Sequence, residues 1–303
     1  MKIVAKTKGM SREDWLAIRR TGIGGSDIPA IMGKSPFSSA FDVWLDKTGE
    51  HTAEVNSEAM EWGVILEDVV GKEFSKRTGI KLKKFNAIVC HDDHRWMLAN
   101  VDRLVVGEDA GCEIKTTNAY FKDTGTCPEL YALQSQWYMG ITGRAKWYVP
   151  VLAGGQVLYR YEVLRNEALI DEMKQVGREF WDLVEKKEMP PIDGSEACAN
   201  LLGQMYSKAD DREVELPLDT FELINQYDEL SEQEKSIKEK KELISNTIKS
   251  FMKDSDRAFV YDRKVYWTNV ESKRFDTKAF KKENPEMYGK YVRESAYRRF
   301  QIK

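Results

Sequence analysis

Four short apolar runs crowded into residues 86–115 constrain the fold of this chain more than any other feature. They occupy residues 87–89, 97–99, 104–106 and 112–114. Short apolar runs bounded by polar residues and glycine are typical of β-strands, and residues 107–111 predict a turn between the last two. Two further strands are expected at residues 147–152 and 157–163, around Gly154 and Gly155.

Helix signals flank these strands on both sides. Ser11 is a cap-like start for a helix that we expect to end near residue 20, and Ser26 predicts the N-cap of a second, short helix after a glycine-rich turn. Longer helices are expected at residues 57–76, at 128–143 and from Asn166 to just before Pro190. The alternation of helices and strands predicts an α/β or α+β core.

A different pattern begins beyond residue 210. Seven apolar residues recur there at heptad spacing, which predicts a long helix or a helical hairpin. They are Leu223, Tyr227, Leu230, Ile237, Ile244, Ile248 and Phe251. Such a helix could pack on its own domain or bind a coiled-coil partner, and both interpretations stay open. A β-hairpin is expected at residues 259–267, with residues 298–303 as an added edge strand. We therefore expect two domains, residues 1–210 and 211–303.

Length and composition exclude several classes of protein. A chain of 303 residues can bury a substantial core, and no apolar run approaches the roughly 20 residues that cross a bilayer. No apolar stretch follows the basic residues near the N-terminus, so we expect no secretory signal and a cytoplasmic location. The four cysteines form no CxxC pair, which indicates reduced structural thiols, and a zinc site at residues 90–94 would lack a well-spaced second ligand pair.

Charge is distributed unevenly along the chain. The net charge is −3, but residues 258–303 carry 12 Lys and Arg against 6 Asp and Glu, a balance of +6, so residues 1–257 sum to −9. A local positive surface is what contact with phosphate requires, and the whole-chain charge does not exclude it. We expect the C-terminal region to contribute DNA binding or partner docking, and no chemistry.

The candidate catalytic residues lie on or beside the expected strands. Asp102 ends one of them, and eleven residues later Glu113 and Lys115 flank Ile114 on another. Alternate side chains of a strand share a face, so Glu113 and Lys115 are expected to point together while Ile114 points into the core. Carboxylates suit Mg²⁺ or Mn²⁺, and a lysine beside such a metal can orient or deprotonate the attacking water. Glu67, on a largely apolar helical segment, is a further candidate ligand.

The Glu-x-Lys pattern alone carries little information in a chain with 32% charged residues. It also occurs at residues 172–174, 185–187 and 239–241, where it is typical of a solvated helix face. The strand context of residues 113–115 and the upstream Asp102 distinguish the first occurrence from the others.

Five motifs follow one another along residues 11–150. They are Trp15-x-x-x-Arg19 with Gly24-Gly25-Ser26-Asp27, Trp62-Gly63-x-x-x-Glu67, Ala99-x-x-Asp102, Glu113-x-Lys115, and Tyr131-x-x-Gln134-x-Gln136. Together they resemble the YqaJ-like branch of the PD-(D/E)xK nucleases, the family of the phage lambda alkaline exonuclease. The family's usual Pro-Asp is Val101-Asp102 here, a departure that leaves the ligands in place because the proline is not one of them.

The resemblance implies a restriction-endonuclease-like core with a mixed sheet flanked by helices, followed by a C-terminal helical and β-hairpin extension. It also implies a Mg²⁺-dependent exonuclease, for which Mn²⁺ can substitute. Such an enzyme digests double-stranded DNA ends from 5′ to 3′ and leaves 3′ tails for recombination. A single-strand annealing protein as partner, a homo-oligomer in the form of a trimeric ring, and a phage or prophage gene in a bacterial host are further expectations of the same kind.

The resemblance also implies roles for individual residues. The expected catalytic residues are Lys115, Glu67, Asp102, Glu113 and Gln134. The expected metal ligands are Asp102, Glu113, Ile114 and Glu67. The terminal 5′-phosphate is expected to bind Arg19, Gly24, Gly25 and Ser26. In that segment glycine lets the backbone approach an anion, and arginine can hold a phosphate with two hydrogen bonds.

Two alternatives stay open. A related nuclease of the same core could act on single strands or cut at internal sites, although an iron–sulfur version would need a cysteine quartet that the spacing does not offer. A DNA-end-binding or scaffold protein of the same fold would not cut at all. Converging carboxylates argue against that second alternative, because they repel phosphate and serve no purpose in a surface that only binds.

Overall fold

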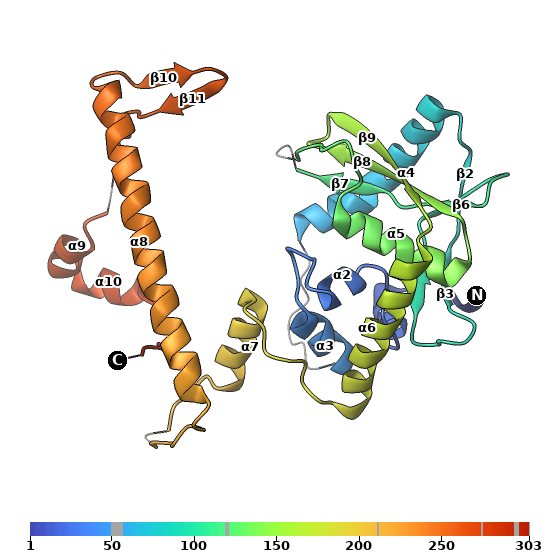
Figure 1. Ribbon diagram of the computed structural model, residues 1–303, viewed down its shortest axis with the longest axis horizontal. Helices are drawn as coiled ribbons and strands as arrows, with labels where there is room; N and C mark the ends of the chain where they lie inside the picture. The colour runs from blue at the N-terminus through green and yellow to red at the C-terminus, as the bar shows by residue number, and fades with distance from the viewer. Residues whose placement is uncertain (50–56, 119–120, 211, 274, 294–296, 303) are drawn as a thin grey trace. The chain divides into compact units, whose positions relative to one another are not determined.

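The computed structural model describes residues 1–49, 57–118, 121–210, 212–273, 275–293 and 297–302 (Figure 1). The chain divides into two compact units, Met1–Gln204 and Met205–Lys303. The first is a mixed α/β unit, and the second consists of helices and one β-hairpin. Each unit is described by itself below.

A six-stranded sheet forms the centre of the first unit, and its mixed character confirms what the family resemblance implies. Its strands are β2 (Leu82–Lys84), β5 (Arg103–Val105), β6 (Ala110–Cys112), β8 (Lys146–Ala153), β7 (Lys115–Thr117) and β9 (Val157–Leu164). Strands β6 and β7 both pair in parallel with β8, whereas β5 pairs antiparallel with β6 and β9 antiparallel with β8. The sheet is therefore mixed, and β8 lies inside it.

The expected strand at residues 112–114 is wrong in its bounds, because the chain leaves the ladder there. β6 ends at Cys112 and β7 begins at Lys115, yet both keep the same register along β8, with Cys112 opposite Tyr148 and Lys115 opposite Val151. Pro150 lies in the matching stretch of β8 and has no N–H with which to continue the ladder. The break falls at the residues that carry the candidate chemistry. The preceding turn is correspondingly shorter than residues 107–111, since β6 already begins at Ala110.

Helices cover both faces of this sheet. On one face α4 (Glu58–Thr78) packs Val70 in a cluster with Cys112 and Ile114, next to Tyr148. On the other face α5 (Glu129–Thr142) and α6 (Glu167–Lys186) belong to the main core, which contains Trp147 of β8. Tyr148 and Trp147 are neighbours in the sequence and face opposite sides, as alternation along a strand requires. Figure 1 shows α4 and α5 on the two sides of the sheet.

A second, three-stranded sheet has the order β1 (Lys2–Lys6), β3 (Ala87–Cys90) and β4 (Leu98–Asn100), all antiparallel. Strand β1 was not expected from the sequence. The expected helix caps are confirmed at Ser11 for α1 (Arg12–Arg19) and at Asn166 for α6. The helix expected from residue 57 has Ser57 as its N-cap residue. The cap expected at Ser26 is wrong, because α2 (Ile28–Ile31) has Asp27 as its N-cap residue.

Two helices of the first unit carry signals that the sequence interpretation did not use. Helix α3 (Ala40–Thr48) starts with a capping box in which Ser39 and Asp42 bond each other's backbone N–H groups. Helix α7 (Glu196–Met205) contributes Cys198 and Leu201 to a small apolar cluster around Phe41. This cluster holds the segment after α6 against α3.

The second unit contains α8 (Thr220–Met252), the hairpin of β10 (Arg257–Val260) and β11 (Arg263–Tyr266), and the short helices α9 (Thr277–Glu283) and α10 (Pro285–Tyr291). The single long helix confirms one of the two forms expected from the heptad pattern, and its seven apolar heptad residues are exposed. The added edge strand at the C-terminus is wrong, because residues 297–302 form no strand. Among the described helices, none is long and apolar enough to span a membrane.

Candidate active site

Glu113 occupies the break between β6 and β7, where its backbone N–H donates to the carbonyl oxygen of Tyr148 at 2.9 Å. Its side chain is 5% exposed, and Oε1 accepts hydrogen bonds from Lys115 Nζ at 3.0 Å and from Gln134 Nε2 at 2.7 Å. Ile114 points the other way, into the apolar cluster under α4. The expected convergence of Glu113 and Lys115 is therefore observed, although an interrupted strand presents them.

Asp102 lies in the tight connection between β4 and β5, next to the break. Its Oδ2 accepts a hydrogen bond from the backbone N–H of Ile114 at 2.9 Å. Because Ile114 lies outside the strand ladder, its N–H is free to make this bond. The connection between β4 and β5 is thereby joined to the start of β7, and the carboxylates of Asp102 and Glu113 are held close together.

Burial and mutual repulsion disfavour the charged forms of these two carboxyl groups. Burial, reinforced by the negative charges of Glu113 and Glu67, raises the pKa of Asp102 well above its ordinary value. Burial likewise raises the pKa of Glu113, against the opposing effect of Lys115. Burial lowers the pKa of Lys115, but the charges of Glu113 and Asp102 outweigh burial and raise it overall. Lys115 thus supplies one positive charge beside two carboxyl groups whose charged forms are disfavoured by burial.

The donor set fits Mg²⁺, which is usually held by one or two carboxylates together with water and substrate phosphates. Oε2 of Glu113 is buried and has no hydrogen-bond partner among the described residues, so an oxygen is available next to Asp102. Within the described ranges no three His, Cys, Asp or Glu side chains are grouped closely enough to hold a metal ion by themselves. Ile114, also an expected ligand, offers only its main chain, since its side chain is in the core.

Glu67 approaches the same region from α4, but it is engaged in an ion pair. Its Oε1 lies 2.6 Å from Nη1 of Arg103, which is 8% exposed in its side chain and also donates to the carbonyl oxygen of Asp102 at 2.9 Å. Asp68 pairs with the other terminal nitrogen of Arg103. Arg103 was not singled out from the sequence, and it ties Glu67 to the connection that carries Asp102.

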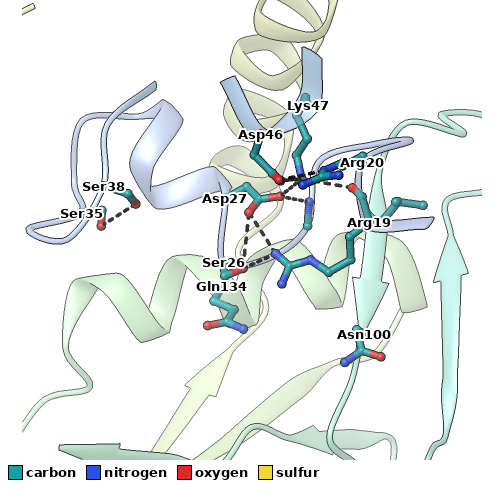
Figure 2. A network of polar contacts seen from close by, with 12 residues as sticks. Arg19, Arg20, Ser26, Asp27, Ser35, Ser38, Asp46, Lys47, Asn100 and Gln134 are labelled. Atoms are coloured by element: carbon teal, nitrogen blue, oxygen red, sulfur yellow. Dashed lines mark hydrogen bonds and ion pairs between the residues drawn. The ribbon is translucent and has the colours of Figure 1, made fainter. Parts of the chain in front are cut away.

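A second polar cluster surrounds Asp27 (Figure 2). Arg19 donates to Ser26 Oγ at 2.8 Å and lies 3.1 Å from Asp27 Oδ1, while Lys47 Nζ lies 2.7 Å from Asp27 Oδ2. The side chain of Lys47 is fully buried, and it also donates to the carbonyl oxygen of Arg19 at 3.1 Å. Burial raises the pKa of Asp27, but the charges of Lys47 and Arg19 with the hydrogen bonds from Lys47 and Gly24 outweigh burial and hold it at about 2.

This cluster fixes the two candidate phosphate-binding side chains in place. The guanidinium of Arg19 stacks 4.8 Å from the ring of Trp15, and its side chain is 26% exposed. The N–H of Gly24 is not free for an anion, because it donates to Asp27 Oδ2 at 2.8 Å. Lys47 also lies 3.4 Å from Asp46, so its charge is shared between two carboxylates and Arg19 is the partly exposed cation of the cluster.

Gly25 connects the glycine-rich turn to α5 by close packing. A Cβ at this position would lie 2.5 Å from the ring of Tyr138 and 3.0 Å from Cγ of Gln134, so no larger residue fits without movement. Tyr138 in turn donates its hydroxyl hydrogen to the carbonyl oxygen of Asn100 at 3.2 Å and accepts from Gln134 Nε2 at 2.9 Å. Tyr138 was missed in the sequence, although it follows Gln134 by four residues and thus shares its helix face.

The two clusters line one pocket of the first unit. Its walls include Arg19, Gly24, Gly25, Ser26, Asp102, Glu113 and Gln134, all of which were expected site residues. Trp15, Asn100 and Tyr138 also line it. Lys115 contacts Glu113 of this pocket, and Glu67 is joined to Asp102 through Arg103. Segments more than 100 residues apart in the sequence, from Arg19 to Gln134, thus meet around one space of about 140 Å³.

Comparison with known proteins gives three principal matches. Residues 14–145 match the family described as the YqaJ-like viral recombinase domain. The chain is 39% identical over 311 residues to the protein YqaJ of Bacillus subtilis (strain 168), an uncharacterized protein, and the alignment covers 100% of this chain and 97% of that protein. A 65-residue stretch is 35% identical to protein D345L of African swine fever virus, over 21% of this chain and 19% of the viral protein.

Among solved structures, the chain is similar to an alkaline exonuclease from Laribacter hongkongensis. The sequence identity is 21%, the match covers 58% of this chain and 94% of that chain, and the TM-score is 0.48. A phage-related exonuclease from Haemophilus somnus 129PT matches at 15% identity over 55% of this chain and 96% of that chain, with a TM-score of 0.39.

Proposed function

The chain belongs to the YqaJ-like viral recombinase family, and on that premise we propose that it is a Mg²⁺-dependent exonuclease acting on double-stranded DNA ends. In this proposal it digests one strand from 5′ to 3′ and leaves a 3′ single-stranded tail for recombination. The observation that carries the proposal is the single pocket in which Asp102 and Glu113 face the same space as Arg19 and Ser26. This adjacency supports a proposed cutting site next to a proposed site for a terminal phosphate.

In the proposed site Asp102 and Glu113 would hold the metal, with Glu67 as an auxiliary acid. A bound Mg²⁺ would polarise the scissile phosphate and make a water molecule more acidic. Lys115 keeps its ammonium beside Glu113 and Asp102, where it can orient the attacking water and offset negative charge that develops on the phosphate. Gln134 acts as a positioning residue, because its amide fixes Oε1 of Glu113.

The proposed terminal phosphate site is built from Arg19 and Ser26, with the backbone of Gly25 at close approach. Arg19 can use its guanidinium nitrogens to bind phosphate oxygens, and a hydroxyl group beside it supplies one more donor. The Arg19 side chain is held by Trp15 on one side and by Asp27 on the other, so little side-chain freedom is lost when an anion binds. A strand end anchored there would present its first phosphodiester toward Asp102 and Glu113.

The proposal places the chemistry in residues 1–210 and DNA or partner binding in residues 211–303. It also includes a homo-oligomer, trimeric in the lambda-type family, a single-strand annealing protein as partner, and a phage or prophage origin. These elements follow from the family resemblance and from the positive balance of residues 258–303.

A directional digestion assay tests this function. We expect a duplex labelled at its 5′ ends to release label first as a mononucleotide, while a 3′-labelled duplex retains its label on the single-stranded 3′ tail, in both cases only with Mg²⁺ or Mn²⁺. Release of 3′ label first would contradict the polarity. Preferential digestion of single strands, or internal cuts in a circular duplex, would favour the related nuclease activities. Binding of duplex ends without any product would favour the non-cutting alternative.

A further inference from the structure

The β10–β11 hairpin of the second unit presents two aromatic and two basic side chains on one face. Its register places Arg257 opposite Tyr266 and Phe259 opposite Lys264. Residues two apart on a strand, and their direct partners across an antiparallel pair, share a face. We call this set of four residues the hairpin face.

The aromatic rings of the hairpin face are turned outward. Phe259 is 83% exposed and Tyr266 is 62% exposed. The opposite side of the hairpin consists of Val260, Arg263 and two half-buried small aliphatic residues, Ala258 and Val265. The apolar packing of the hairpin therefore falls to the small residues, and the large rings are left in solvent, which is the reverse of what folding alone favours.

A third aromatic side chain extends the same feature at the turn. Tyr261 is 97% exposed and adopts a φ of 51°, in the left-handed region that disfavours a residue with a side chain. Glycine would remove this strain. The exposed ring of Tyr261 buries almost no apolar surface in exchange for this strain, which points to a role in contact with a ligand.

Cations and aromatic rings alternate across the hairpin face, and no carboxylate belongs to it. The acids that flank β10 in the sequence, Asp256 and Asp262, lie at its two ends, and Asp256 forms an exposed ion pair with Arg257 at 3.6 Å. Exposed rings offer stacking surfaces for unpaired bases, and adjacent cations bind the phosphates between them. A duplex offers no free base faces to such rings, because its bases are stacked on each other.

We propose that the hairpin face, with Tyr261, binds single-stranded nucleic acid. The bases stack on Phe259, Tyr266 and Tyr261, and the phosphates contact Arg257 and Lys264. The inference does not depend on cutting, since it concerns a binding surface in the second unit. If the proposed exonuclease activity is also present, its 3′-tailed product is a ligand of the required chemistry.

The test is binding of a fluorescein-labelled oligothymidylate to the full chain, measured by anisotropy in EDTA so that no cleavage occurs. Phe259→Ala and Tyr266→Ala are expected to weaken binding about five-fold or more each, while Val260→Ala on the opposite side leaves it unchanged. Lys264→Ala is expected to lower the slope of log affinity against log salt by about 0.7, while Arg263→Ala, which removes the same charge from the other side, does not.

Tyr261→Gly separates binding from folding. It relieves the backbone strain while it removes a ring, so thermal unfolding of the variant is expected at the wild-type temperature or above, together with weaker oligothymidylate binding. Equal losses for Lys264→Ala and Arg263→Ala, or wild-type affinity in Phe259→Ala, would overturn the proposal. Absence of oligothymidylate binding by the wild type would also overturn it and would leave the exposed rings to a protein partner. If the wild-type protein shows no nuclease activity but binds oligothymidylate through the hairpin face, only the proposed enzymatic function is contradicted.

Discussion

The side-chain amide of Gln134 donates a hydrogen bond of 2.7 Å to Oε1 of Glu113, in the interior of the first unit. Helix α5 thereby holds a carboxylate that lies in a break of the central sheet. The amide also donates to the hydroxyl group of Tyr138, whose own hydrogen bond goes to the carbonyl oxygen of Asn100. Helix α5 and the end of β4 thus fix the orientation of this candidate catalytic carboxylate, and its second oxygen has no hydrogen-bond partner among the described residues.

Gln134→Ala should lower metal-dependent cleavage by about 10- to 100-fold, the usual effect of losing a residue that orients a metal ligand. The loss should appear partly as a higher Mg²⁺ concentration for half-maximal rate, since Glu113 is no longer held. Gln136→Ala is the matched control, because Gln136 is equally buried on α5 but bonds to Leu164 and Asn166 away from the site. It should lower thermal stability without changing the Mg²⁺ requirement; the same Mg²⁺ shift in both variants would contradict the positioning role.

Arg19→Ala should remove the preference for 5′-phosphorylated duplex over 5′-hydroxyl duplex while sparing the metal requirement. The neighbouring Arg20 is the control, because it pairs with Asp46 at 3.1 Å, does not line the pocket, and carries the same charge. Initial rates on the two substrates should differ for the wild type and for Arg20→Ala and converge for Arg19→Ala. Equal wild-type rates on both ends would remove the support for a phosphate site.

Asp27 should make folding stability depend on acid. Its pKa is depressed from 3.8 to about 2, so it contributes stability that is fully present above pH 3.8 and is lost as the pH falls toward 2. The contribution is roughly 2 kcal/mol at neutral pH. Asp27→Asn should lower the free energy of unfolding at pH 7, where Lys47 remains buried without its partner, and should flatten the loss between pH 4 and pH 2. Urea unfolding at pH 4 and at pH 2 measures the free energy of unfolding of both proteins. If this free energy depends on pH in the same way in Asp27→Asn and in the wild type, the ion pair does not have the proposed role.

Asp102→Asn should stabilise the metal-free fold while it removes activity. The pKa of Asp102 is raised, mainly by burial, so its ionised form opposes folding above the ordinary pKa and its neutral form does not. In EDTA at pH 7 the variant should unfold at higher urea, by on the order of 1 kcal/mol. Mg²⁺ should stabilise the wild type by mass action and leave the variant unchanged. If Mg²⁺ stabilises the wild type and Asp102→Asn equally, the ion does not bind at Asp102.

The convergence of the candidate catalytic residues could be predicted because it follows from residue type and spacing. Asp102, Glu113 and Lys115 stand out by their positions beside apolar strands, whatever the details of the strands are. The break at Glu113 could not be predicted in the same way, because it depends on Pro150, a residue of a strand that comes 37 positions later. The alternation rule correctly predicted that Glu113 and Lys115 converge, although the expected strand at residues 112–114 is interrupted in the structure.

The residues that hold the site residues in place could not be predicted from the sequence, because no distinctive sequence pattern marks them. Lys47 is one of many lysines, and only the fold shows that its side chain is fully buried against Asp27. Arg103 likewise gains its role from α4, through Glu67. Ser26 looked like a helix cap because serine is favoured there, but Asp27 takes the cap position and Ser26 is free to bond Arg19. The roles of these residues depend on tertiary contacts, which the local sequence does not show.

The measurement that tests the central claim most directly is the Mg²⁺-dependent digestion of a 5′-phosphorylated duplex by Lys115→Ala and Asp102→Ala. Lys174→Ala serves as the control, because it belongs to another Glu-x-Lys pattern, on α6, where it makes a surface pair with Asp171. Each catalytic variant should lose cleavage by at least about 1,000-fold and keep the wild-type circular dichroism, while the control retains the full rate. Wild-type-like cleavage by either catalytic variant at saturating Mg²⁺ would contradict the assignment of this cluster as the cutting site.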